Sequence, residues 1–203
     1  MGIAERKERE KKEMRQRILD TAMEQFTKDG YDKLSLRKVA KEMEYSPGTL
    51  YLHFKNKDEI YYALHDQCFR LLQDEFLKHM QIPDPLDRLR ALGRTYISFG
   101  LNNPEKYNLM FIEKAPMEQI EGQETWECAK RTFDILVESL QACIDAEYFP
   151  NKNVMQVAMI TYSAVHGMVS LELHRHLKMF PEESKENLIN DTNEYLIQLL
   201  MKS

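Results

Sequence analysis

Apolar residues recur at intervals of three and four along most of this chain, and that spacing is what most limits its fold. Such intervals place side chains on one face of an α-helix, whereas a strand needs alternation. Prolines and glycines, seven of each in 203 residues, separate one series from the next. The sequence therefore predicts an all-α protein of about nine helices. The first series marks a helix of about residues 5–29 and consists of Met14, Ile18, Ala22 and Phe26.

The composition fits a helical protein in water. A hydrophobic content of 43% lets 203 residues bury one sizeable core or two small ones. No run approaches the roughly 20 apolar residues of a membrane span, and the chain begins with charged residues instead of an apolar leader. We therefore expect a cytoplasmic protein with no membrane partner. The three cysteines are far apart and form no CxxC pair, so we expect no disulfide framework, metal or cofactor.

Charge is divided unevenly along the chain. The net charge is −5, which by itself speaks against a polyanionic partner. Residues 1–60 nevertheless contain 14 basic and 12 acidic residues, a balance of +2, whereas residues 61–203 contain 14 and 21, a balance of −7. We therefore expect the two parts to face different partners, and the charge of the first part permits DNA binding.

Two short helices are predicted after Gly30. Ser35 stands at the N-cap position of the segment LRKVAKEM, whose apolar residues fall on one face. About three residues after that segment, Ser46 and Pro47 supply a second cap and a first helical position. Two short helices joined by so short a turn form a helix-turn-helix pattern, although a bare two-helix corner has the same signals.

Longer helices follow. The predicted segments run from Asp58 to about Met80, Leu86 to Leu101, Pro104 to Ile112, Glu118 to Glu147, Val154 to about Lys178 and Glu182 to Lys202. The helix from Val154 is apolar on nearly every side through its middle, so it must be covered on more than one face. With the last helix, it predicts a partner chain as well as an internal core. The residues assigned to that dimer interface are Leu188, Thr192, Tyr195, Leu196 and Leu199.

Several motifs match a known pattern residue by residue. Gly30-Tyr31, Ser35 with Val39-Ala40, and the run SPGTLYLHFKNK from Ser46 resemble the N-terminal DNA-binding domain of the TetR family of transcriptional regulators. The match covers about residues 15–62, and its spacing is highly specific. A second likeness lies in residues 164–173, which are similar to the His-Gly motif of the WHG-type C-terminal domain, with Tyr162 where that motif has Trp.

The resemblance implies a domain organisation and a mode of action. Residues 1–57 would form the helix-turn-helix DNA-binding domain, with a charged extension over residues 1–14, and residues 58–203 a helical ligand-binding and dimerisation domain. Members of the family usually act as homodimeric repressors that a small, largely apolar ligand releases from a palindromic operator in double-stranded DNA. An occupied pocket would move the helix after the DNA-binding domain and change the spacing of the two recognition helices.

The resemblance also assigns DNA contacts. The helix from Pro47 would lie in the major groove, with Gly48 allowing close backbone approach and Thr49 offering a hydroxyl and a methyl group. Arg37 is the predicted guanine contact, and Lys57 is a phosphate contact that holds every sequence alike. The complete predicted set is Ser35, Arg37, Pro47, Gly48, Thr49, Tyr51, His53 and Lys57.

The same segment has a buried side and one departure from the family pattern. Leu50 and Phe54, four residues apart, are predicted to form the buried face of the recognition helix. Met43-Glu44-Tyr45 replaces the Ala-Gly-Val that is usual in the family. Glu44 then occupies a left-handed turn position at a strain of about 1 kcal/mol. Tyr45 is expected to pack on the first helix, with a DNA contact as the alternative.

A ligand pocket is expected among the middle helices. Most of its candidate residues are aromatic, and such side chains also serve as ordinary core. His166 is the most distinctive polar group among them, and Gly167 beside it indicates a close approach between helices. The candidates are Phe99, Tyr107, Met110, Phe111, Trp126, Phe133, Tyr162 and His166.

Two other kinds of function fit the sequence less well. An enzyme is not expected, because the sequence contains no GxSxG, P-loop or HExxH motif. A helical protein-interaction module without specific DNA binding is the alternative. Such a module has no need of donors spaced for phosphates, which the sequence supplies in Thr49, Tyr51, His53 and Lys57.

Overall fold

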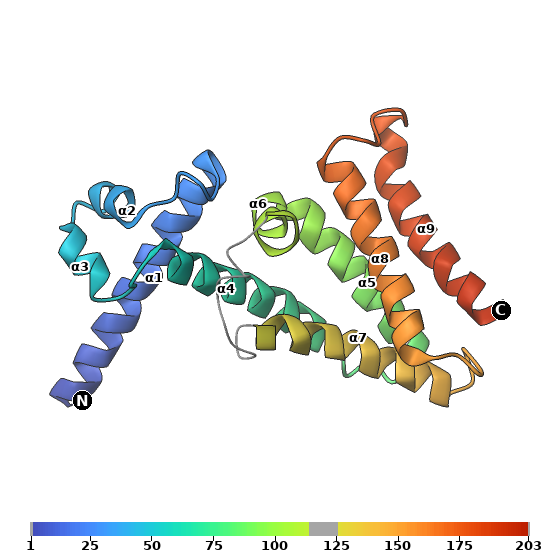
Figure 1. The fold of residues 1–203 in the computed structure, drawn as a ribbon. Helices are drawn as coiled ribbons and strands as arrows, with labels where there is room; N and C mark the ends of the chain where they lie inside the picture. Colours follow the sequence, from blue (N-terminus) through green and yellow to red (C-terminus); the bar gives the residue numbers. More distant parts are fainter. Residues whose placement is uncertain (1, 114–125, 203) are drawn as a thin grey trace. The chain divides into compact units, whose positions relative to one another are not determined.

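The computed structural model describes residues 2–113 and 126–202, without the side chains of residues 182–184, 186 and 202. These ranges contain nine α-helices, one short π-helix and no strand, which confirms the all-α prediction (Figure 1). In chain order the elements are α1 (Ile3–Asp29), α2 (Leu36–Glu42), α3 (Pro47–Tyr51), α4 (Lys57–Leu77), α5 (Pro85–Asn102), α6 (Pro104–Tyr107), η1 (Asn108–Ile112), α7 (Glu127–Asp145), α8 (Val154–Leu173) and α9 (Glu182–Lys202).

The described residues fall into two compact units. The first contains the chain up to Cys68 together with residues 109–113, and the second contains residues 69–108 and 126–202. The division therefore lies inside α4, whose N-terminal half belongs to the first unit and whose C-terminal half belongs to the second. The domain boundary proposed from the sequence, between residues 57 and 58, lies at the first turn of the same helix.

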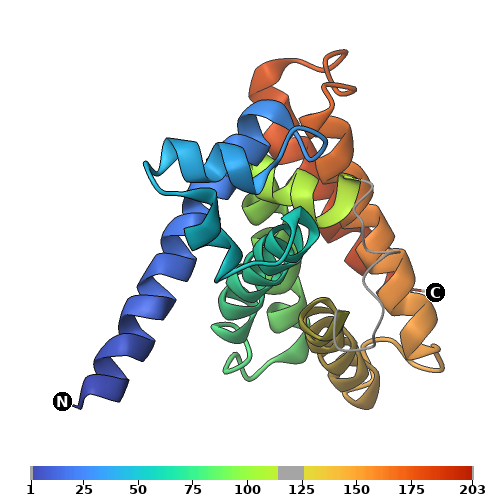
Figure 2. The ribbon, with the colours of Figure 1, turned by 60° about the vertical axis from the view of Figure 1, so that its left-hand side comes forward.

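The first unit is a small helical core built on the C-terminal half of α1. Figure 2 shows α2 and α3 lying beside this helix. Ile18 and Ala22 of α1 are fully buried, as is Val39 of α2. Leu50 in α3 and Phe54 just after it are also buried, which confirms the predicted inner face of the second short helix. These side chains give a five-residue helix the tertiary support that so short a helix lacks by itself.

Side-chain caps fix where the short helices begin. The Ser35 hydroxyl accepts a hydrogen bond from the Lys38 amide at 3.2 Å, at the start of α2. The Ser46 hydroxyl accepts one from the Thr49 amide at 3.3 Å, at the start of α3. Each cap satisfies a backbone N–H that has no partner within its own helix, so α2 and α3 start where the sequence predicted.

The turn between α2 and α3 has the predicted strained residue. Glu44 adopts a left-handed conformation with φ of 61°. A non-glycine residue there costs on the order of 1 kcal/mol. Tyr45 packs on α1 as expected, because the Arg17 guanidinium lies 5.5 Å from its ring centroid and donates to its hydroxyl at 3.3 Å. The contact between Tyr45 and Arg17 helps to hold the turn against α1.

The second unit packs α5 against α7, α8 and α9. A core cluster of this unit combines residues from all four helices and from the α7–α8 connection. Each helix therefore buries its apolar face against the others. Figure 1 shows α8 and α9 lying side by side, in agreement with their contacts. The members with the least exposure are Leu89, Leu140, Cys143, Phe149, Ala158 and Ile197.

Two glycines of α5 permit this close packing. A Cβ atom at Gly100 would lie 2.5 Å from Cγ1 of Val169, and one at Gly93 would lie 2.7 Å from Nδ2 of Asn193. The close approach predicted at Gly167 is wrong for the described residues, because a Cβ atom there would meet nothing within 4 Å. The close approach of α5 to α8 therefore occurs at Gly100 of α5, and Gly167 of α8 takes no part in it.

The apolar helix α8 is only partly covered by the unit to which it belongs. Within residues 2–113 and 126–202, α8 is the one helix whose length and composition would allow it to cross a membrane. One side of α8, including Val157, Val165 and Val169, is buried in the second unit. The other side leaves Met155 and Ile160 about half exposed, so the unit covers only part of this apolar helix.

Candidate DNA-binding site

The helix α3 presents one apolar and one open side. Leu50 is fully buried and Phe54 is 1% exposed, so these two side chains anchor the helix. Pro47 and Gly48 are exposed, and Tyr51 keeps 51% of its surface. The predicted DNA-binding residues of α3 are therefore available on the side away from the core.

The conformation of Gly48 does not require a glycine. Its φ is not positive, and a Cβ atom would meet only the Ser46 hydroxyl, at 3.7 Å. Glycine is intrinsically less favourable than alanine in a helix, at a cost that reaches roughly 1 kcal/mol in helix interiors. No contact within the described chain offsets that cost. An external surface that approaches the backbone closely would account for it.

The hydroxyl of Thr49 is already oriented. Its Oγ1 shares a 3.0 Å hydrogen bond with the Ser46 hydroxyl, which also caps α3. This bond leaves Oγ1 with further hydrogen-bonding capacity, because a hydroxyl has one donor and two acceptor positions. The arrangement fixes the side chain before any partner binds.

Arg37 is an open cation on α2. Its side chain is exposed and makes no hydrogen bond or ion pair with any residue in the described ranges. The next residue, Lys38, instead forms an ion pair with Asp29 at 3.5 Å. Lys38 is therefore already paired, whereas the planar guanidinium of Arg37 is available for a base edge or a phosphate.

Lys57 has a neighbour that the sequence did not reveal. Its ammonium nitrogen lies 4.1 Å from the ring centroid of Tyr31, a cation–π contact. The Tyr31 hydroxyl in turn donates a hydrogen bond to the Asp58 carboxylate. Burial and the negative charge of Asp58 raise the pKa of the Tyr31 hydroxyl well above its usual range. Asp58 thus holds Tyr31, and the ring of Tyr31 holds the Lys57 ammonium group at the first turn of α4. A ring contact leaves the ammonium group with its charge.

His53 lies at the junction of α3 and α1. Burial lowers the pKa of its imidazole below the ordinary value, and the positive charges of Lys11 and Arg15 lower it further. Its Nδ1 is buried and has no hydrogen-bond partner within the described residues. The imidazole is therefore neutral at pH 7 in the free protein, and a nearby phosphate would favour its protonation.

Two features of this surface lie outside the predicted set of contact residues. Leu52, at the C-cap of α3, is 79% exposed, a large apolar side chain on an otherwise polar corner. Arg15 of α1 reaches the end of α3, where its Nη1 donates to the His53 backbone oxygen at 2.9 Å, and Lys11 lies one turn before it on the same helix. Their spacing of four residues was a usable signal, because it puts both cations on one face of α1.

The predicted pocket residues do not form a single site. Four of them gather in the second unit, where the ring of His166 lies 5.4 Å from that of Tyr107 and 5.6 Å from that of Tyr162. The Phe133 ring lies 6.0 Å from that of Tyr162. The Tyr107 hydroxyl also shares a 2.7 Å hydrogen bond with Nδ1 of His166. We call these four residues, together with Tyr96, the aromatic cluster.

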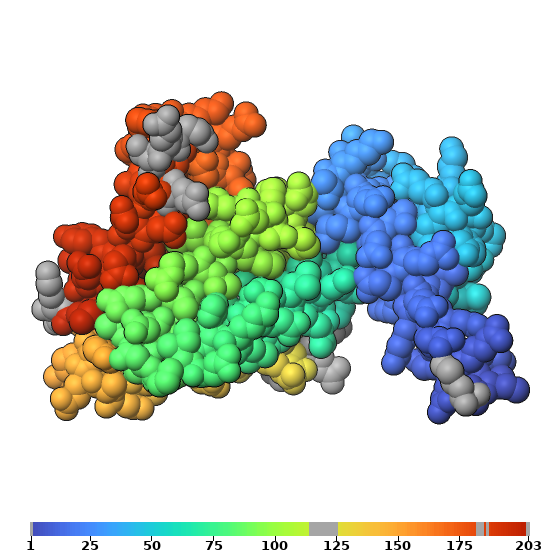
Figure 3. All heavy atoms as spheres, turned by 180° about the vertical axis from the view of Figure 1, so that it is seen from behind, coloured from blue at the N-terminus to red at the C-terminus, as the bar shows by residue number. Residues whose placement is uncertain are grey.

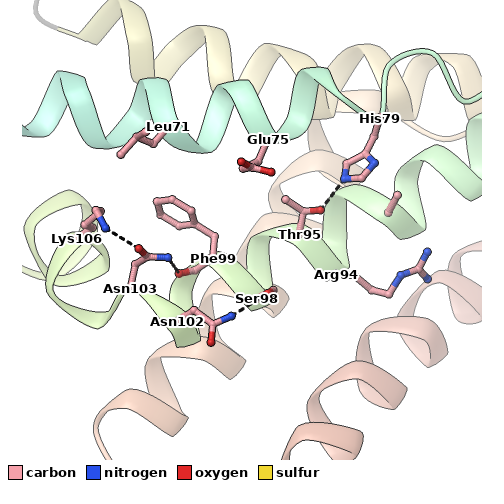
Figure 4. A pocket seen from close by; sticks show the side chains of 11 residues that line it. Leu71, Glu75, His79, Arg94, Thr95, Ser98, Phe99, Asn102, Asn103 and Lys106 are labelled. Atoms are coloured by element: carbon pink, nitrogen blue, oxygen red, sulfur yellow. Dashed lines mark hydrogen bonds between the residues drawn. The ribbon is translucent and has the colours of Figure 1, made fainter.

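The other predicted pocket residues lie elsewhere. Phe99 lines a groove of about 600 Å³ between α4, α5 and α6, where it faces Leu71 and Glu75 (Figure 4). At one end of that groove His79 shares a 2.8 Å hydrogen bond with Thr95. Trp126 is about half exposed just before α7. The last two predicted residues belong to the first unit and are Met110 and Phe111.

The geometry of the two units defines a class of protein. The first unit is a helix-turn-helix whose second helix turns exposed polar groups away from a buried apolar anchor. The second unit is a helical domain with an aromatic cluster and a partly uncovered outer helix face. Such a combination is that of a DNA-binding regulator with a separate helical domain.

Comparison with known families agrees with that class. A family profile described as "Bacterial regulatory proteins, tetR family" matches residues 18–64, and one described as "Tetracyclin repressor-like, C-terminal domain" matches residues 89–191. Together they match residues in both units, and the second alone covers half of the chain. The chain belongs to the TetR family of transcriptional regulators. The matched families are those of regulators and not of enzymes.

Individual relatives support the same placement. The negative transcriptional regulator IcaR of the biofilm operon icaADBC in Staphylococcus epidermidis is 33% identical over 100 residues, which are 49% of this chain and 52% of IcaR. This chain thus matches about half the length of that relative. The transcriptional regulator AcrR of Shigella flexneri is 26% identical over 175 residues, which are 82% of this chain and 81% of AcrR.

A solved structure has the same fold. The TetR family transcriptional regulator PfmR from Thermus thermophilus superposes with a TM-score of 0.70 over 89% of this chain and 97% of its own. The sequence identity is 20%, so this likeness establishes the fold alone.

Proposed function

We propose that this protein is a homodimeric repressor that binds a palindromic operator through α2 and α3 and is released by a small, largely apolar ligand. The observation that carries the proposal is that α3 has a buried side, anchored by its own Leu50 and by Phe54 just after it, and an open side with Gly48 and Tyr51. The open side is suited to the major groove, since Pro47 and Gly48 at the N-terminal end of α3 are exposed.

In this proposal, a different DNA contact is assigned to each of Arg37, Thr49 and Lys57. Arg37 reads a guanine, because its guanidinium has no partner in the described chain and can bond in a bidentate manner. The Thr49 hydroxyl, held by Ser46, contacts a base edge or phosphate. Lys57 neutralises a backbone phosphate from the first turn of α4. Ser35, Pro47 and His53 complete the contact surface around them.

The dimer forms through the uncovered faces of α8 and α9. On α9, Leu188, Tyr195 and Leu199 are exposed, whereas Ile197 on the opposite side is buried in the core. Thr192 lies on the same exposed face. Leu196 packs against the core cluster and borders that face. The exposed apolar residues of α8 extend the same kind of surface, which a second copy of the chain would cover.

The ligand site is proposed at the aromatic cluster. Burial lowers the pKa of His166, so its imidazole is neutral at pH 7 and suits an apolar ligand better than an anionic one. Rings from α5, α6, α7 and α8 meet there, and a ligand that separates them would shift these helices against one another. The relative named as a negative regulator supports repression as the mode of control. A bacterial regulator of this kind would act in the cytoplasm, where the DNA lies.

Selection from a random duplex pool tests the proposal. The wild-type protein should enrich a sequence with two inverted half-sites whose centres lie about 34–36 Å apart. A Tyr195→Glu/Leu199→Glu variant should sediment as a monomer and lose most of its affinity for the enriched sequence. Exposed α7 residues offer a matched control, so Lys130→Glu/Arg131→Glu should remain dimeric. Enrichment of no sequence would favour a protein-interaction module instead.

A further inference from the structure

A second groove in the second unit is separate from the aromatic cluster. It has a volume of about 930 Å³ and lies between α5, the start of α6, the end of α8 and the first turns of α9. Figure 3 shows the C-terminal part of α5 on the same face as the end of α8 and the α8–α9 connection. This volume is in the range of pockets that hold small organic molecules. None of the residues predicted from the sequence to bind a ligand lines it.

The described rim of this groove is strongly cationic. Arg94 of α5 and Arg175 and Lys178 of the α8–α9 connection line it, and all three are exposed. Their charged groups make no hydrogen bond or ion pair with any residue that the structure describes. Lys185 of α9 is a fourth lining cation and is largely buried. Four positive charges at one concave surface raise the local concentration of anions.

One carboxylate accompanies these cations. Glu172 at the end of α8 places Oε1 3.8 Å from the Lys185 ammonium, and its Oε2 is buried with no partner among the described residues. Within the described lining, a single carboxylate therefore faces four cations, and the balance of these five charges is positive. Glu172 also orients Lys185 across the space between α8 and α9.

The lining of the groove also contains aliphatic residues, alongside the polar Ser98, Asn102 and Asn190. Ile97 of α5 and Ile189 of α9 are almost fully buried, and Leu101 and Leu173 are half-buried beside them. These aliphatic side chains offer no hydrogen bond, so a bare inorganic anion would gain nothing from them. A ligand that fits both surfaces has an anionic head and a short apolar body.

We propose that this groove binds an amphipathic organic anion, such as a medium-chain carboxylate. The anionic head would contact Arg94 and Arg175, and the aliphatic body would lie over Ile97 and Ile189. The site is independent of the aromatic cluster and of DNA binding, so its test needs no operator. A bound anion would bridge α5 to the α8–α9 connection.

Calorimetric titration of the whole protein with octanoate tests this site, with octanol as the neutral probe of similar shape and acetate as the headgroup without the body. Octanoate should bind with saturation at one site per chain. Both octanol and acetate should bind more weakly by about tenfold or more, because octanol lacks the anionic head and acetate lacks the apolar body.

A second experiment measures octanoate binding by variants that lack charges in the groove. Arg94→Gln/Arg175→Asn should weaken octanoate binding by about tenfold or more. Asparagine is chosen because Arg175 has a φ of 60°, which asparagine tolerates. The control Lys130→Gln/Arg131→Gln removes the same charge from α7 and should leave affinity unchanged. Lys178→Gln repeats the test at one exposed position, should the double variant not fold.

Three outcomes would overturn the proposal. The first is the absence of saturable octanoate binding, and the second is equal affinity for octanoate and octanol. The third is an equal loss of affinity in the groove variants and the α7 control. None of these bears on operator selection, so failure here is distinguishable from failure of the regulator function.

Discussion

The guanidinium carbon of Arg15 lies 4.0 Å from the centroid of the Phe54 ring, and its Nη1 donates to the backbone oxygen of His53 at 2.9 Å. Arg15 belongs to α1, and Phe54 follows the proposed recognition helix. One side chain of α1 therefore stacks on the anchor of α3 and also holds the carbonyl group beside it. The position of α3 depends on α1 through this contact.

Replacing Arg15 by methionine should lower the free energy of unfolding by about 1–2 kcal/mol. The change removes a cation–π contact and a charged hydrogen bond but keeps an apolar stem over Phe54. Urea denaturation followed by circular dichroism measures the loss. Arg6→Met removes an exposed cation from the same helix and should change stability by less than about 0.5 kcal/mol. Similar losses in both variants would show that the Phe54 contact contributes nothing.

Two glycine positions give opposite expectations for the same substitution. Gly100→Ala should destabilise the protein by about 1–3 kcal/mol, because the new methyl group would overlap Val169. Gly167→Ala should stabilise it by about 0.5–1 kcal/mol, because alanine suits a helix interior and meets nothing there. Thermal and urea unfolding of both variants measure the difference. A stabilised Gly100→Ala variant would contradict the packing of α5 on α8.

His65 should make the protein less stable in mild acid. Burial lowers its pKa from 6.5 to about 4, although a hydrogen bond with the Met110 backbone opposes the change. The unfolded chain then binds the proton more readily than the folded chain. Stability is therefore fully present above pH 6.5 and is lost as pH falls from 6.5 towards 4, by about 3 kcal/mol in total.

The comparison of His65→Gln with the wild-type protein isolates this effect. The glutamine variant should show a smaller loss of stability between pH 7 and pH 4, in urea titrations at each pH. His176→Gln, at an exposed position, should retain the wild-type pH profile. Parallel profiles for His65→Gln and the wild-type protein would assign the acid sensitivity to other groups.

The sequence was sufficient for the fold because the relevant signals are local. Ser35 and Ser46 mark helix starts by capping, and the spacing of Leu50 and Phe54 identifies the buried face of α3. Glu44 was predictable for the same reason, since a left-handed turn residue is set by the few residues around it.

Contacts between distant residues were not predictable in this way. The cation–π contact of Lys57 with Tyr31 and the placement of Arg15 on Phe54 join residues whose separation in the sequence carries no period. Gly167 was misjudged, because one glycine inside a helix does not reveal which side faces a neighbour. The groove between α5 and the α8–α9 connection was not predicted either, because its lining residues are far apart in the sequence.

The central claim is that Arg37 reads sequence while Lys57 binds the backbone of any duplex. The direct test measures the affinity of the wild-type, Arg37→Ala and Lys57→Ala proteins for the enriched duplex and for a scrambled one, at several salt concentrations. Circular dichroism of each variant first confirms that it is folded.

The two variants should lose affinity in different ways. Lys57→Ala should weaken binding to both duplexes alike and reduce the slope of log affinity against log salt by about 1. Arg37→Ala should lose about 1–3 kcal/mol on the enriched duplex, little on the scrambled one, and tolerate a changed base pair. The reverse pattern, or equal losses on both duplexes for both variants, would contradict the proposed reading of DNA by α2 and α3.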